Sequence, residues 1–160
     1  VESGARAVQL EPVALAPIVR DVHELFEPSA EQEGVRLTLE VECEVQGRGN
    51  RELIAQALTN LLDNAFKYGV GGTDPTFVLR LFAEDGQACI SVSDNGPGIP
   101  PDQIEAVLER FVRLDSSRTK PGSGLGLSLV KAVANLHSGQ LLLRDNEPGL
   151  YAEFRLPIAS

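Results

Sequence analysis

The sequence is poor in basic residues, in cysteine and in long apolar runs, and each shortage excludes a class of protein. The 14 Lys and Arg stand against 23 Asp and Glu, which disfavours nucleic acid as the main partner because a phosphate backbone requires a basic surface. A small nucleotide needs only local positive charge and is not excluded. Cys43 and Cys89 do not suggest a disulfide framework, and we expect Cys89 to be a core residue within a strand. No apolar stretch approaches the roughly 20 residues of a membrane span, and no signal peptide is visible.

Methionine is absent altogether, and the chain begins at Val1. We therefore interpret the sequence as an excised piece of a longer protein. Its 160 residues suggest one domain with a sizeable core, and the apolar fraction of 42% is typical of globular domains. Residues 1–12 are interpreted as the tail of a preceding helix plus a linker, and residues 13–160 as the domain.

Local periodicity predicts helices and strands along most of the chain. Helical spacing of apolar residues predicts helices over 13–30, 51–68 and 128–137, with a shorter helix-like segment over 102–111. Alternating or continuous apolar residues predict strands over 35–42, 77–82, 88–92, 140–144 and 152–156. Turns are expected at 47–50, 84–86 and 147–149, and the turn at 84–86 predicts a hairpin.

The helix predicted over 51–68 carries two different faces. One is an apolar stripe of Ile54, Leu58, Leu61, Leu62 and Ala65. Residues three and four positions apart are neighbours on a helix, so a second face gathers Asn60, Asn64, Lys67 and Tyr68. Asparagine is a mediocre helix former, and two of them one turn apart favour a binding site over a merely solvated face.

Asp94 follows the strand predicted over 88–92 and is itself followed by Asn95-Gly96-Pro97-Gly98-Ile99-Pro100. The glycines and prolines force a turn, which places a partly buried carboxylate where the backbone is open. Such a carboxylate can accept a hydrogen bond from the amino group of a ligand. An ordinary acidic turn is the alternative, because short glycine motifs are weak evidence on their own.

A cluster of cations and a glycine-rich turn follow. Arg110, Arg113, Arg118 and Lys120 lie close together in an otherwise acidic chain, either as a solvated charge run or as a lid that meets an anion. The sequence Gly122-Ser123-Gly124-Leu125-Gly126-Leu127 then leads into the helix predicted over 128–137. A glycine-rich turn before a helix N-terminus presents free N–H groups and the positive end of the helix dipole, which together suit a phosphate.

Taken together these motifs are far more specific than any one of them. The order Asn60-x3-Asn64-Ala65-x-Lys67-Tyr68, Asp94-x-Gly96-x-Gly98-Ile99, Glu109-Arg110-Phe111 and 122–127 resembles the N, G1, F and G2 boxes of the catalytic ATP-binding domain of sensor histidine kinases. The wider superfamily includes DNA gyrase B, Hsp90 and MutL. The resemblance covers about residues 14–157.

The resemblance implies an α/β two-layer sandwich, the Bergerat ATP-binding fold, in which helices cover one face of a mixed β-sheet. It implies ATP and Mg²⁺ as ligands and a lid over about 97–124. Asp94 would accept the adenine amino group, Tyr68 would flank the base, and Asn64 would be the metal ligand through its hard amide oxygen. Asn60, Lys67 and Arg113 are the catalytic candidates, placed near the γ-phosphate or on phosphate oxygens.

The remaining nucleotide-binding candidates also follow from the resemblance. They lie in the turn after Asp94, among the cations and in the glycine-rich turn: Gly96, Gly98, Ile99, Arg118, Lys120, Gly122, Ser123, Gly124, Leu125, Gly126 and Leu127. Gly122, Gly124 and Gly126 would give the lid its hinge. The catalytic contribution of the chain would then be positioning and charge neutralisation.

The sequence departs from the family pattern at three positions. Ala14 and Asn50 stand where Asp is common, and Ala152 stands where a Thr near the adenine is common. None of these departures removes a phosphate or metal contact. The two histidines do not match a phosphoryl acceptor: His23 lacks the sequence context of the acceptor motif, and His137 is expected to cap helix carbonyls or to lie at the surface.

We therefore expect the chain to act on a histidine in a dimerisation hairpin that precedes it in the parent protein. The resemblance further implies a response regulator downstream, a cytoplasmic position for this domain, and a membrane-anchored homodimeric parent, while the isolated domain is expected to be monomeric. Two alternatives stay open: a module that holds ATP without transferring phosphate, and a protein-serine kinase of the anti-sigma type. An ATP-driven clamp like gyrase or Hsp90 is disfavoured, because its transducer domain would lie outside the chain.

Overall fold

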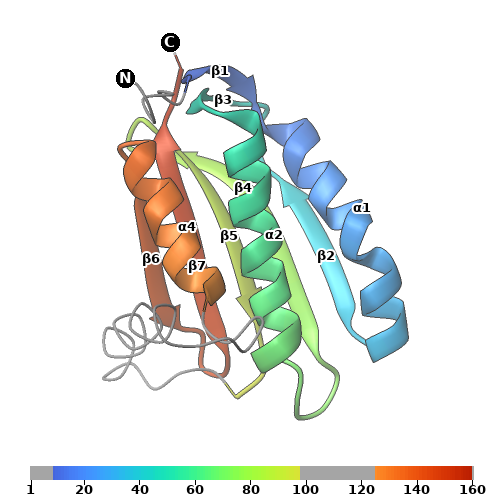
Figure 1. Ribbon diagram of the computed structural model, residues 1–160. Helices are drawn as coiled ribbons and strands as arrows, with labels where there is room; N and C mark the ends of the chain where they lie inside the picture. The colour runs from blue at the N-terminus through green and yellow to red at the C-terminus, as the bar shows by residue number, and fades with distance from the viewer. Residues whose placement is uncertain (1–8, 98–124, 160) are drawn as a thin grey trace.

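The computed structural model describes residues 9–97 and 125–159 (Figure 1). Three helices and seven strands are assigned in these ranges. In chain order they are β1 (Glu11–Ala14), α1 (Leu15–Glu33), β2 (Arg36–Val41), β3 (Gln46–Gly49), α2 (Arg51–Tyr68), β4 (Thr76–Glu84), β5 (Gln87–Asp94), α4 (Leu125–Leu136), β6 (Gln140–Asp145) and β7 (Leu150–Pro157). No helix in the described ranges is both long and apolar enough to cross a membrane.

The main sheet has five strands in the order β2-β4-β5-β7-β6. Strands β2 and β4 are parallel, and α2 lies between them in the chain, whereas every other neighbouring pair is antiparallel. A separate two-stranded sheet pairs β1 with β3. The mixed sheet predicted from the resemblance is therefore confirmed.

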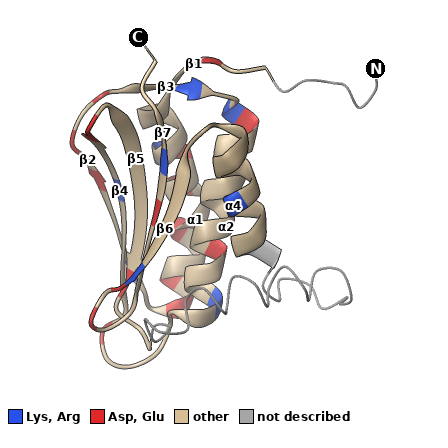
Figure 2. Cartoon of the chain, turned by 90° about the vertical axis from the view of Figure 1, so that its left-hand side faces the viewer, with Lys and Arg blue, Asp and Glu red and all other residues tan. Residues whose placement is uncertain are grey.

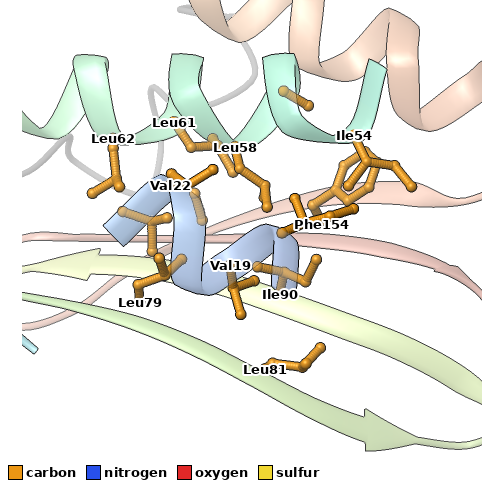
Figure 3. Packing of buried hydrophobic residues seen from close by; sticks show 14 of the residues in the cluster. Val19, Val22, Ile54, Leu58, Leu61, Leu62, Leu79, Leu81, Ile90 and Phe154 are labelled. Carbon is orange, nitrogen blue, oxygen red and sulfur yellow. The ribbon is translucent and has the colours of Figure 1, made fainter. Parts of the chain in front are cut away.

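The helices form one layer and the main sheet the other (Figures 1 and 2). Helix α1 contacts β2 and β4, α2 contacts β5, and α4 contacts β6 and β7. Figure 3 shows the core between the layers, where side chains of α1 and α2 meet those of the sheet. Burial of such apolar side chains is the main favourable term in folding. The predicted two-layer sandwich is confirmed, with the described helices all on one face of the sheet (Figures 1 and 2).

Helix α2 has the predicted bounds, and its sequence explains both of its ends. Asn50 is the N-cap, and its Oδ1 accepts a hydrogen bond from the N–H of Leu53 at 3.0 Å. The predicted apolar stripe of the helix is fully buried. At the other end the N–H of Gly69 donates to the carbonyl of Ala65 at 2.7 Å. The helix is therefore fixed to the core along its length, which holds the polar residues of its C-terminal half in place.

The N-terminal boundary was predicted wrongly. Residues 11–14 are not a linker followed by a helix from Val13, because they form β1 and the helix begins at Leu15. Residues 46–49, which include most of the turn predicted at 47–50, form β3 and pair with β1 in antiparallel register. This pairing joins segments far apart in the chain, so local periodicity does not show it. Ala14 is the N-cap of α1 and makes no side-chain capping hydrogen bond.

Helix α4 begins three residues earlier than predicted. Its first residues are Leu125, Gly126 and Leu127, which were assigned to a glycine-rich turn. Leu127, Val130, Val133 and Ala134 are buried, so the apolar stripe that holds the helix against the core starts inside the glycine motif. One glycine in a helix costs only about 1 kcal/mol, and the packing of this stripe offsets it.

His137 is buried rather than at the surface, with an exposed fraction of 1%. Its Nδ1–H donates to the carbonyl of Val133 at 2.8 Å, which is the helix cap that was expected. Its Nε2 accepts from the N–H of Asn50 at 3.0 Å, so the ring joins the end of α4 to the start of α2. The backbone N–H can only donate, and this fixes the neutral tautomer protonated at Nδ1. The two free cysteines agree with the prediction, with Cys89 buried in β5.

Candidate functional site

Three elements end or begin together at one end of the domain (Figure 1): the C-terminus of α2, the C-terminus of β5 and the N-terminus of α4. The turn between β6 and β7 lies at the same end. Helices α2 and α4 also contact each other. The polar residues predicted on α2 and the carboxylate predicted after β5 therefore belong to one region of the molecule.

Asp94 is the last residue of β5 and has an exposed fraction of 5%. Its Oδ1 accepts two backbone hydrogen bonds, from the N–H of Gly96 at 3.0 Å and from the N–H of Leu150 at 3.2 Å. Burial raises the pKa of the Asp94 carboxyl above its usual value, and the two N–H groups partly offset that rise. The predicted place at a strand end is confirmed, and the carboxylate is buried more deeply than the partial burial that was predicted.

The second oxygen of Asp94 faces the loop that follows α2. A Cβ placed on Gly69 would lie 2.8 Å from Oδ2 and 2.7 Å from Cγ, closer than real side chains pack. Gly96 approaches the same loop, since a Cβ there would lie 2.0 Å from the carbonyl oxygen of Gly69. Both described hydrogen bonds to the carboxylate use Oδ1. Glycine at position 69 therefore leaves Oδ2 as an acceptor for a ligand.

The two asparagines of α2 differ in burial. Asn60 is half-buried, whereas Asn64 has an exposed fraction of 7%. In residues 9–97 and 125–159 the side-chain amide of Asn64 makes no hydrogen bond. A buried amide without a partner is costly, about 1–3 kcal/mol, so its retention points to a ligand. Its carbonyl oxygen is a hard donor that fits Mg²⁺.

Lys67 and Tyr68 end α2 and are more exposed. The Nζ of Lys67 lies 3.0 Å from Oδ2 of Asp63, one helical turn earlier, and the two side chains are 37% and 51% exposed. Tyr68 has an exposed fraction of 51%. Both side chains lie at the same helix end as the loop that contacts Asp94. The structure therefore brings the last predicted residues of α2 to the neighbourhood of the carboxylate.

Several predicted residues lie outside the described ranges, together with all but Pro97 of the lid predicted over 97–124. They are Gly98, Ile99, Arg113, Arg118, Lys120, Gly122, Ser123 and Gly124. Leu125 and Gly126 are in the first turn of α4. Leu127 is 2% exposed in the core, so its backbone rather than its side chain is available to a ligand.

Sequence reasoning missed three residues around Asp94. Gly69 was not singled out, although its lack of a side chain keeps Oδ2 of Asp94 open. Asn146 and Leu150 donate hydrogen bonds to Asp94, Asn146 from its side chain to the main-chain oxygen at 2.7 Å. They lie more than 50 residues further along the chain, and no local pattern links positions so far apart.

The two histidines of the chain lie on α1 and at the end of α4. His23 is in the middle of α1, where its Nε2 donates to the carbonyl of Leu37 at 3.1 Å. His137 is buried at the C-terminal end of α4. That neither histidine is the phosphoryl acceptor stays a prediction.

The arrangement combines a carboxylate in a fixed position with polar side chains that can still bind a ligand. Asp94 offers one acceptor oxygen, with a closely packed backbone around it. Asn64 offers a buried amide, and Lys67 offers a cation that forms a partly exposed ion pair with Asp63. These groups suit a ligand with an amino-bearing ring at one end and anionic groups, with or without a divalent cation, at the other.

Comparison with known proteins agrees with this geometry. Residues 49–160 match the family model of histidine kinase-, DNA gyrase B- and HSP90-like ATPases. The signal transduction histidine-protein kinase/phosphatase MprB of Mycobacterium avium is 44% identical over 101 residues, which are 63% of this chain and 19% of MprB. The chain therefore spans only about a fifth of that relative.

Solved structures extend the likeness to nearly the whole chain. The catalytic domain of histidine kinase ThkA, in a nucleotide-free form, superimposes with a TM-score of 0.79 at 26% identity, covering 93% of this chain and 95% of that one. Full-length ShkA in complex with AMPPNP gives a TM-score of 0.80 at 30% identity, covering 98% of this chain and 33% of that one. The chain belongs to the family of histidine kinase-, DNA gyrase B- and HSP90-like ATPases, and within it is the catalytic ATP-binding domain of a sensor histidine kinase.

Proposed function

We propose that this domain binds Mg·ATP at the end of the sheet marked by Asp94 and transfers the γ-phosphoryl group to a histidine on a helical hairpin elsewhere in the parent protein. The observation that carries the proposal is the buried carboxylate of Asp94, whose Oδ1 is held by two backbone N–H groups while Oδ2 stays available. Oδ2 accepts the adenine amino group, and a keto group at that position of the ring would be repelled.

The phosphate end of the nucleotide lies along the polar face of α2. Asn64 is the metal ligand, and a Mg²⁺ ion held there would neutralise charge on the phosphates. The buried and unpartnered state of this amide in the described ranges supports that role. Asn60, one turn earlier, orients the γ-phosphate, and Lys67 contacts phosphate oxygens. Arg113, outside the described ranges, is assigned the same task from the sequence.

The proposed nucleotide site is completed by the segments that follow Asp94 and precede α4. Tyr68 flanks the base, while Gly96, Gly98 and Ile99 allow the backbone to approach it. The cations Arg118 and Lys120 and the backbone of residues 122–127 serve the phosphates. Helix α4 begins at Leu125, so the positive end of its dipole and its first N–H groups are directed to this region. The catalytic domain, predicted over residues 13–160, includes all of β1 and so begins at Glu11, and residues 97–124 are its lid.

The parent protein supplies the acceptor and the output. We infer that it is a membrane-anchored homodimer with this domain in the cytoplasm, that the hairpin which dimerises it also carries the acceptor histidine, and that a response regulator takes the phosphoryl group onward. The domain alone is then a monomer that binds ATP and shows little or no autophosphorylation, in keeping with the positions of His23 and His137.

The test has two stages. Calorimetric titration of ATP into the wild-type domain, with and without Mg²⁺, should show binding that Mg²⁺ strengthens. Mixing the domain with labelled ATP and a separately expressed hairpin of the parent should then label the hairpin with a phosphoryl group that is lost in acid and stable in base.

Each alternative gives a different result. Binding without transfer to the hairpin would indicate a nucleotide-holding module. An acid-stable label would indicate a serine kinase of the anti-sigma type. Absence of ATP binding by a folded domain would refute the proposal for this chain.

A further inference from the structure

The turn between β6 and β7 contacts Asp94, as the loop after α2 also does. The Nδ2–H of Asn146 donates to the main-chain oxygen of Asp94 at 2.7 Å, and the N–H of Leu150 donates to its Oδ1 at 3.2 Å. Gly149 packs against the main-chain oxygen of Asp94, because a Cβ on Gly149 would lie 1.8 Å from that oxygen. Its φ of +108° is also a conformation that favours glycine. The turn is therefore in direct backbone contact with Asp94.

These contacts begin where the regular sheet stops. The ladder between β5 and β7 ends at the pair Ser93 and Tyr151, one residue before Asp94. Beyond that pair, ladder hydrogen bonds no longer fix the β5 backbone to β7. In their place the side chain of Asn146 donates to the main-chain oxygen of Asp94, while the N–H of Leu150 donates to the carboxylate. The turn is closed by the N–H of Asn146 donating to the carbonyl of Gly149 at 2.9 Å.

A carboxylate at a strand end has two freedoms that would spread its acceptor oxygen over many directions. The ladder with β4 ends at Asp94 and the ladder with β7 ends one residue earlier, so the side of the strand end that faces β7 can tilt. The carboxyl group can also rotate about its last bond, which has a broad and shallow preference. The hydrogen bond from Asn146 restrains the first freedom. The hydrogen bond from Leu150, added to that from Gly96, restrains the second. The direction of Oδ2 is thereby fixed before any ligand arrives.

We propose that Asn146 is a positioning residue for adenine recognition, which holds the strand end so that Oδ2 of Asp94 meets the 6-amino group of the base. The inference rests on the proposed function of Asp94. The proposal predicts a specific defect. Loss of Asn146 should weaken the binding of nucleotides that carry the 6-amino group and should leave the binding of nucleotides without it unchanged. A residue that merely stabilised the turn would instead weaken the binding of every nucleotide alike, or of none.

The experiment compares ATP with purine riboside 5′-triphosphate, which has hydrogen in place of the 6-amino group, by calorimetry on the folded domain. The ratio of the two dissociation constants measures the contribution of the amino group. Asn146→Ala should lower the preference for ATP about fivefold, as expected for one neutral hydrogen bond, and leave the affinity for the analogue unchanged. Asn146→Asp, which has nearly the same size but no donor, should lower it at least as much.

Asp145→Ala is the matched control. The Oδ1 of Asp145 accepts from the N–H of Glu147 at 3.1 Å within the same turn, and the side chain makes no hydrogen bond to Asp94. The control should therefore keep the wild-type preference for ATP. An equal loss in Asp145→Ala and Asn146→Ala would show that the effect comes from loosening the turn, and it would overturn the positioning role.

The two proposals fail in different ways. If the wild-type domain binds ATP and the analogue equally well, the base-recognition role of Asp94 is wrong and the inference falls with it. If the wild type prefers ATP and both Asn146 variants keep that preference, adenine recognition stands and the role of Asn146 is refuted. Circular dichroism and urea unfolding of each variant establish that folded proteins are compared.

Discussion

Asp94 and Asn64 are both buried polar residues at the same end of the domain, but they differ in how many hydrogen bonds their side chains make. The Oδ1 of Asp94 accepts from two backbone N–H groups, and a side chain from another turn holds its main-chain oxygen. The amide of Asn64 makes no hydrogen bond within the described ranges. The side chain of Asp94 is therefore fixed before a ligand binds, whereas the amide of Asn64 keeps its donor and acceptor groups for the ligand.

The difference follows from where each residue lies in its element. Asp94 stands at a strand end, where turns supply N–H groups that no ladder uses. Asn64 is inside a helix, where backbone N–H groups are already bonded to carbonyls four residues earlier. The base end of the proposed site is therefore organised by the fold alone, whereas the metal and phosphate end is completed by what binds there. Substitutions at the two ends should have correspondingly different consequences.

The largest effect is expected from Asp94→Asn. The new amide oxygen can still accept from Gly96 and Leu150, but the NH₂ group then faces the adenine amino group, donor against donor. ATP affinity should fall about 100-fold, because a buried polar group is left unpaired in the complex. Calorimetry checks this result. The free energy of unfolding at pH 7 should rise, since burial raises the pKa of Asp94 and the variant carries no buried charge. Unchanged ATP affinity would contradict the proposed role of the carboxylate.

Acid titration sharpens the same comparison, with Asp94→Asn as its control. A carboxyl whose pKa is raised on folding binds its proton at higher pH in the folded state than in the unfolded state. As the pH falls from neutral through the folded-state pKa of Asp94, the free energy of unfolding of the wild type should therefore rise relative to that of the variant. Over the same pH range the affinity of the wild type for ATP should decline. Urea unfolding and calorimetry over an acid pH series measure the two trends. Parallel stability curves for the two proteins would contradict the raised pKa.

A smaller and more selective effect is expected from Asn64→Ala. The Mg²⁺-dependent part of ATP affinity should fall about tenfold, because one hard oxygen ligand is lost. Affinity measured without Mg²⁺ should hardly change. Asn64→Asp, which keeps an oxygen at the same position, is the matched control and should retain the Mg²⁺ dependence. Equal losses with and without the metal would show that Asn64 serves the fold or the phosphates rather than the ion.

The sequence predicted most of this framework and missed the contacts that complete it. Strong periodicity gave the correct bounds for α2, and the apolar run followed by glycines and prolines correctly placed Asp94 at a strand end, although only partial burial was predicted. The pairing of β1 with β3 and the reach of Asn146 to Asp94 depend on segments brought together only by folding. The prediction started α4 too late, because the glycines at 122–126 predict a turn. The buried apolar face of the helix in fact begins at Leu127, within the glycine-rich segment.

The smallest effect should come from Asp63→Asn, at the exposed edge of the phosphate end. The pair between Asp63 and Lys67 joins two partly exposed side chains at 3.0 Å, and such helix pairs contribute about 0.3–0.5 kcal/mol. Lys67 can therefore leave Asp63 for a phosphate at little cost. Removing the competing carboxylate should raise ATP affinity about twofold at low salt and less as screening increases. Calorimetry at two salt concentrations, with Asp63→Asn/Lys67→Gln as control, tests this prediction. A gain that persists in the double variant would show that Asp63 repels the phosphates directly. A gain that disappears there would show that the exposed end of the site is tuned through a cation free to change partners, in contrast to the fixed carboxylate at the buried end.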